Sequence, residues 1–209
     1  SFTEPENTQF FDVPVKEFKE MIVQTVFAVS DDETRYFMNG VFMEKKENNL
    51  IFAATDGRRL AFIKHDFGVA IPDFKGSIVP PKILSIIQRR SSDEGMLSIG
   101  VSEKNIFFNF AAYKFSSVLI DGQFPNYDRV IPESQQHFFE ANREDFLQAL
   151  KRVALLVEQK SKRIFLKITD GSLAISSNEN ELGTADEEIA CQYQGEETNT
   201  ALNYAYLEE

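Results

Sequence analysis

The pattern of apolar and polar residues predicts the same succession of elements three times along the chain. A short apolar strand, a helix-start signal and an amphipathic stretch follow one another in residues 10–22, 76–87 and 138–150. Within the first stretch Phe18, Met21 and Ile22 recur at helical spacing. The starts also carry suitable residues. Pro14, Pro80 and Pro81 fix φ near the helical value and have no amide hydrogen to leave unpaired, and Asn142 caps free amides.

Runs of β-forming residues follow each predicted helix and are separated by turn residues. They comprise residues 39–44, 50–55 and 59–64; 96–99, 105–110 and 114–120; and 164–168, 172–176 and 184–189. The unit is therefore strand, helix and three strands, repeated with a period of roughly 60 residues. We predict an α+β fold in which antiparallel sheets pack one face against the helices.

Two such units make one domain, predicted for residues 9–130, and residues 131–136 form a linker. The third unit opens a further domain at residues 137–209 and has no partner unit. Residues 199–207 resemble the opening of a fourth unit, after which the chain stops at Glu209. We interpret the chain as a fragment of a longer protein.

The composition fits a globular protein, with 43% hydrophobic and 26% charged residues. There is no membrane-spanning apolar run and no signal-peptide pattern at the first residues. The single cysteine, Cys191, excludes an internal disulfide and a cysteine-based zinc site, so a cytoplasmic setting is expected. The net charge of −11 argues against a protein that simply coats DNA, but it is compatible with one basic face on an acidic body.

Enzyme chemistry is not indicated by any motif. His65 and His137 are far apart, and the sequence contains no P-loop, nucleophile elbow or Gly-rich dinucleotide loop. The acidic runs at residues 31–33 and 186–188 are more typical of solvated loops than of magnesium sites. We expect no catalytic residue, no metal and no cofactor.

Four local motifs occur in a fixed order. They are residues 32–41 with Arg-Tyr-x-x-Asn-Gly, residues 54–61 with Ala-Thr-Asp-Gly-Arg-Arg-Leu-Ala, residues 122–132 with Gly-x-Phe-Pro-Asn-Tyr-x-Arg-Val-x-Pro, and residues 203–207 with Asn-x-x-Tyr-Leu. Together they resemble the bacterial DNA polymerase III beta subunit, the beta sliding clamp family. The resemblance implies a non-enzymatic processivity factor that encircles double-stranded DNA without sequence preference, with helices lining the DNA side and sheets outside.

The family's subunit has three domains of two units each and closes into a ring-shaped homodimer. By resemblance, residues 1–8 are a linker from a missing first domain, residues 9–130 are the middle domain, and residues 137–209 are the first half of the third domain. Such a chain is not expected to close the ring by itself.

The resemblance also implies a groove for short peptide motifs of replicative and translesion polymerases, the clamp loader and mismatch-repair proteins. The matching residues are Met38, Thr55, Gly57, Arg58, Arg59, Leu60, Pro125, Arg129, Val130, Asn203 and Tyr206. Without the resemblance, the Asp56-Gly57 pair indicates simply a tight hairpin turn. Arg58 stands where the family often has His, and Ser161 stands where some members have an aromatic residue.

Contacts with DNA are implied for Arg35, Tyr36, Phe37, Lys82, Arg89, Arg90, Lys151 and Arg152, and a ring interface for Leu155 and Leu156. Ordinary structural roles compete with each of these. The segment 35–37 also fits a strand start with buried aromatics. The cations on the helices also fit a solvated helix face, and the two leucines also fit a core position. The competing function is a protein-interaction module that has a peptide groove but no DNA role.

Overall fold

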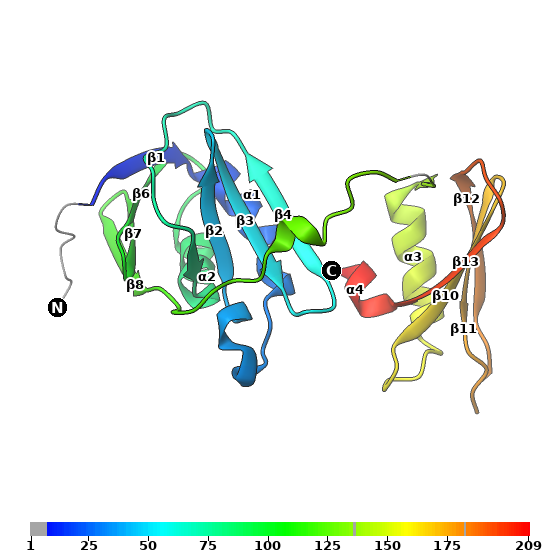
Figure 1. The fold of residues 1–209 in the computed structure, drawn as a ribbon. Coiled ribbons are helices and arrows are strands. Elements are labelled where there is room, and N and C mark those ends of the chain that lie inside the picture. Colours follow the sequence, from blue (N-terminus) through cyan, green and yellow to red (C-terminus); the bar gives the residue numbers. More distant parts are fainter. Residues whose placement is uncertain (1–7, 136, 182) are drawn as a thin grey trace. The chain divides into compact units, whose positions relative to one another are not determined.

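The structure is a computed structural model that describes residues 8–135, 137–181 and 183–209. The chain divides into two compact units, Ser1–Ile131 and Pro132–Glu209 (Figure 1). The predicted linkers at residues 1–8 and 131–136 lie partly outside the described residues. As predicted, each unit combines antiparallel sheets with a few helices.

Two four-stranded antiparallel sheets form the first unit. One has the order β1 (Phe10–Pro14), β6 (Met96–Val101), β7 (Asn105–Phe110) and β8 (Tyr113–Val118). The other has the order β4 (Leu60–His65), β3 (Asn49–Thr55), β2 (Val41–Lys46) and β5 (Ser77–Val79). The first strand of each repeat thus pairs with the sheet of the other repeat. This exchange joins the two repeats into one folding unit.

Helices α1 (Val15–Val23) and α2 (Pro81–Arg90) pack against each other and follow Pro14 and Pro80, so both predicted starts are confirmed. Their apolar faces share one core with both sheets. The segment 35–37 is not a strand. It lies in a short 3-10 element, η2 (Glu33–Met38), which is kinked at Arg35. Two further 3-10 turns are η1 (Val26–Ala28) and η3 (Tyr127–Arg129).

The segment that follows β8 crosses the outer face of the sheet β4-β3-β2-β5 (Figure 1). The amide of Ile120 donates to the carbonyl of Ile78 at 2.9 Å, and the Phe124 ring stacks on Phe42 at 5.0 Å between centroids. A second apolar cluster therefore lies on this face, and β3 is buried on both sides. We call residues 124–130 of this segment the strap.

One five-stranded antiparallel sheet and two helices form the second unit. The elements are β9 (Glu140–Ala141), α3 (Arg143–Ala154), β10 (Arg163–Thr169), β11 (Ser172–Ser177), β12 (Asp186–Gln192), β13 (Thr198–Asn203) and α4 (Tyr204–Glu208). The strand order is β13-β10-β11-β12-β9. β13 pairs with β10 as β5 pairs with β2, and a helix follows each, which is the arrangement expected for the opening of a fourth unit.

Replacing Asn142 with alanine is expected to destabilise the second unit by about 1 kcal/mol. The Asn142 side chain accepts hydrogen bonds from the amides of Glu144 and Asp145 at 2.9 and 3.1 Å, which confirms the predicted cap of α3. Urea unfolding followed by circular dichroism measures the change. Asn142→Asp retains the acceptor and is expected to stay near the parent, so an equal loss in both variants would contradict the capping role.

Candidate functional site

A hollow of about 370 Å³ opens on the first unit where the β3–β4 turn meets the strap. It is lined by Met38, Thr55, Gly57, Arg58, Arg59, Leu60, Pro125, Asn126, Tyr127 and Val130. Most residues predicted for the groove from the first unit are thus brought together. Asn126 and Tyr127 were not predicted, although they lie inside the quoted motif of residues 122–132.

Hydrogen bonds within the turn fix the shape of one wall. Thr55 pairs with Leu60 at the ends of β3 and β4, and the Asp56 carboxylate accepts from the amides of Arg58 and Arg59 at 2.9 and 3.2 Å. Gly57 has φ +88°, a left-handed conformation that glycine adopts without strain. The hairpin turn predicted from Asp56-Gly57 is therefore present, and it places Leu60 beside the hollow.

The two arginines of this wall are in different electrostatic surroundings. Arg59 pairs with Asp56 at 3.1 Å and donates to the carbonyl oxygen of Phe27 at 2.9 Å. The Arg58 side chain is exposed and forms no ion pair with any acid in the described part of the chain. Leu60, Pro125 and Val130 form an apolar surface beside the positive charge of Arg58. Val130 is the most open of the three, with 65% of its surface exposed. Such a site suits a partly apolar peptide.

Three predicted groove residues do not line the hollow. Arg129 lies on η3 with an exposed side chain. Asn203 and Tyr206 belong to the second unit, where the Asn203 side chain caps α4 by accepting from the amide of Ala205 at 3.0 Å. Tyr206 lies on α4 and is half-buried.

The cations predicted to contact DNA fall into two groups. Lys82, Arg89 and Arg90 on α2 are exposed and form no ion pair within the described ranges. On α3, Arg152 binds both carboxylate oxygens of Glu187 at 2.7 and 3.0 Å, and Lys151 lies 4.0 Å from Glu208. The positive charge of Arg152 is therefore paired with an acid, and Lys151 has an acid at the limit of an ion pair. Lys16 was not predicted from the sequence. It is exposed on α1, which packs against α2, and so adds a further cation to the surface of this helix pair.

The side chains of η2 differ in exposure. Tyr36 is 52% exposed, whereas Phe37 packs against the apolar cluster under the strap. Arg35 pairs with Asp32 at 2.8 Å. Hydrogen bonds from Thr34 and Arg35 lower the pKa of Asp32 to about 2, so this carboxylate stays charged and holds Arg35 in place.

Leu155 and Leu156 follow α3. Leu155 is 78% exposed, so the core interpretation is wrong for this residue, whereas Leu156 is half-buried. Since single exposed apolar residues are common on protein surfaces, the ring interface stays a prediction for both leucines.

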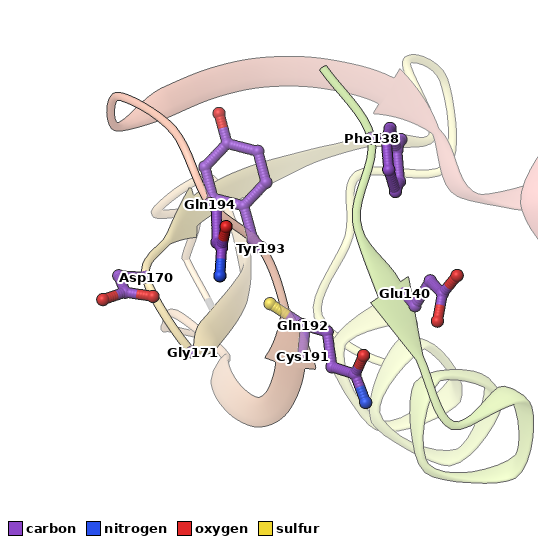
Figure 2. Close-up of a pocket in the computed structure, with 8 residues that line it drawn as sticks. All are labelled: Phe138, Glu140, Asp170, Gly171, Cys191, Gln192, Tyr193 and Gln194. Atoms are coloured by element: carbon purple, nitrogen blue, oxygen red, sulfur yellow. The ribbon is translucent and has the colours of Figure 1, made fainter. Parts of the chain in front are cut away.

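A second hollow, of about 610 Å³, lies on the second unit (Figure 2). It is lined by Phe138, Glu140, Asp170, Gly171, Cys191, Gln192, Tyr193 and Gln194. Burial raises the pKa of the Cys191 thiol, which disfavours a reactive thiolate. No chemical role is therefore assigned to this hollow. Phe138 and β9 hold the same position in the third repeat as Phe10 and β1 hold in the first repeat, where β1 pairs with β6.

Neither a metal centre nor a membrane span is found in the described part of the chain. No group of three or more His, Cys, Asp or Glu side chains is placed to hold a metal ion among those residues. None of the helices there is long and apolar enough to cross a membrane.

Comparison with known proteins gives a consistent result. Residues 12–126 match the profile of the DNA polymerase III beta subunit, central domain, and residues 128–209 that of its C-terminal domain. The beta sliding clamp of Treponema pallidum (strain Nichols) is 51% identical over 201 residues, which cover 94% of this chain and 54% of that protein. Thus the chain spans about half the length of the curated relatives it matches.

Solved structures support the same assignment. A DNA polymerase sliding clamp from Pseudomonas aeruginosa with ligand is 30% identical, with a TM-score of 0.93 over 99% of this chain and 57% of that chain. A clamp from the same organism bound to griselimycin has a TM-score of 0.92 at 29% identity, over 100% of this chain and 57% of that chain. The fold is that of DNA clamps. The chain belongs to the DNA polymerase III beta subunit family, whose matched members are named beta sliding clamps.

Proposed function

We propose that this chain is part of a non-catalytic DNA sliding clamp that confers processivity on a replicative polymerase. The family membership and the hollow beside the strap support this function. An apolar wall of Leu60, Pro125 and Val130 next to the exposed Arg58 suits a short peptide that has both apolar and polar side chains. This hollow is the observation that carries the proposal.

The partners follow from the proposed role. Replicative and translesion polymerases, the clamp loader and mismatch-repair proteins would each insert a short motif into the hollow. Arg129, Asn203 and Tyr206 would extend the groove, and Leu155 with Leu156 would contribute to ring closure. The full-length protein would act in the cytoplasm as a ring-shaped homodimer around duplex DNA.

Titration of a fluorescently labelled peptide of the Gln-Leu-x-Leu-Phe type tests this function directly. We expect micromolar binding to the full-length gene product, and a Kd that is higher by at least about tenfold for Leu60→Ala, because truncating a buried apolar anchor of an interface costs about 2 kcal/mol. Val118→Ala is the control, since Val118 is an exposed apolar residue outside the hollow. Equal affinity of the Leu60→Ala variant and the parent would reject the groove.

The competing function is a peptide-binding module without a DNA role. The net charge of −11 and the pairing of Arg152 with Glu187 favour it, because both weaken attraction to phosphate. Charge reversal on α2 and η2 separates the two functions, because it would abolish retention on DNA only if these cations contact phosphates.

A further inference from the structure

A cluster of four polar side chains connects the strap to the neighbouring strand. Lys46 is the last residue of β2, and its Nζ lies 2.9 Å from the Tyr127 hydroxyl, 2.7 Å from a carboxylate oxygen of Asp128 and 3.2 Å from Glu44. The Tyr127 hydroxyl also donates to the same Glu44 carboxylate. Each of the four groups therefore has a partner inside the cluster.

The charge states in this cluster are well defined at neutral pH. Burial by itself would lower the pKa of Lys46, but its hydrogen bonds to Asp128, Tyr127 and Glu44 outweigh burial and raise that pKa. Burial and the hydrogen bond to Glu44 raise the pKa of Tyr127 to about 12. Lys46 is thus an ammonium ion and Tyr127 a neutral phenol across the physiological range.

Aromatic contacts hold the Tyr127 ring in one place. Its centroid lies 5.4 Å from that of Phe62 and 6.3 Å from that of Phe42, and Lys46 Nζ lies 4.7 Å from the Tyr127 centroid. The ring is buried, and the same side chain lines the hollow described above. Tyr127 therefore belongs both to the polar cluster and to the wall of the hollow.

The strap has little regular structure to hold its shape. Its η3 turn spans only Tyr127–Arg129, and so short a 3-10 turn depends on side-chain anchors. Phe124 anchors the beginning of the strap by stacking on Phe42. The Lys46 cluster anchors its end, next to Val130, which lines the hollow.

We propose that Lys46 and Glu44 are positioning residues for peptide binding, which fix the Tyr127–Val130 wall of the hollow from behind without touching the ligand. This inference rests on the proposed function. Neither residue lines the hollow, and the side chain of Lys46 is 41% exposed, so its ion pairs contribute modestly to global stability. The main effect is on the geometry of the wall.

Peptide titration of the full-length gene product tests the role. Lys46→Met keeps the apolar stem and removes the charge, and we expect the Kd to rise roughly three- to tenfold, the equivalent of one or two hydrogen bonds. Lys46→Arg keeps the ion pair with Asp128 and is expected to recover most of the affinity. Tyr127→Phe keeps the ring, loses the hydroxyl and is expected to weaken binding as Lys46→Met does.

Lys45→Met is the matched control, because the neighbouring Lys45 pairs with Asp73 at 2.6 Å, away from the strap. We expect the peptide affinity of Lys45→Met to stay near that of the parent protein. The thermal unfolding midpoints of Lys45→Met, Lys46→Met, Lys46→Arg and Tyr127→Phe are also expected to stay near the parent value. If Leu60→Ala weakens binding but Lys46→Met and Tyr127→Phe do not, the positioning role is overturned while the groove stands. If Leu60→Ala also has no effect, the proposed function itself fails. An equal loss in Lys45→Met and Lys46→Met would likewise overturn the inference.

Discussion

Replacing Phe18 with alanine is expected to lower the free energy of unfolding of the first unit by about 3–5 kcal/mol. The Phe18 side chain projects from α1 and has no exposed surface. Its ring meets Phe52 of one sheet edge-on at 5.4 Å and Phe108 of the other sheet at 5.8 Å. Truncation would therefore leave a cavity at the point where the helix layer contacts both sheets, and few neighbouring groups are free to fill it.

Urea unfolding followed by far-ultraviolet circular dichroism measures this change. Phe138→Ala is the control, because Phe138 lies in the second unit and is 71% exposed, and its replacement is expected to change stability by less than about 0.5 kcal/mol. A decrease of under about 1 kcal/mol for Phe18→Ala would contradict a shared core beneath the two sheets.

Local chemistry made much of this fold predictable. The proline and asparagine signals gave the correct starts of α1, α2 and α3, because a missing amide hydrogen or a capping oxygen acts within one helical turn. The Asp56-Gly57 pair gave the β3–β4 hairpin, because its positive φ is a local requirement. Interactions between near neighbours in the chain leave a readable pattern.

Contacts between distant residues were not predictable in the same way. Nothing local in β1 or β5 shows that each pairs with the sheet of the other repeat. The path of the strap was not predicted either, because it depends on Phe124 reaching Phe42 across the sheet. The core prediction for Leu155 was wrong for a similar reason. Helical spacing does not show that α3 ends at Ala154, so that Leu155 lies beyond the helix and is exposed.

The candidate site shows the same division. Resemblance to the family placed Leu60, Pro125 and Val130 in the groove, and the structure brings them around one hollow. The resemblance did not indicate that Tyr127 also lines the hollow, or that Glu44 and Lys46 hold its hydroxyl. These contacts form only because β2 and the strap lie next to each other. The pairing of Arg152 with Glu187 likewise depends on tertiary packing.

Reversing the charge of Arg35, Arg89 and Arg90 together, by replacement with glutamate, is expected to abolish retention of the full-length gene product on circular DNA at physiological salt. Arg89 and Arg90 are exposed on α2 and form no ion pair among the described residues, so they are available to phosphates. For every phosphate that the protein no longer neutralises, the slope of log affinity against log salt concentration should become shallower by about 0.9. The glutamates add repulsion to a protein whose net charge is already −11.

The measurement is gel filtration of protein loaded on nicked circular plasmid, with the same plasmid linearised as a test of topological linkage. The matched control reverses Lys64, Lys75 and Lys104, which are exposed cations away from the helices and change the net charge equally. We expect this control to keep most of its retention. Absence of retention in both triple variants would indicate that total charge, not the α2 surface, governs DNA binding. Unchanged retention in the arginine variant would remove the DNA role and leave the peptide-binding module. Arg89 and Arg90 lie on α2 and do not line the hollow, whereas Arg35 lies on η2 and approaches Gly57, which does line it.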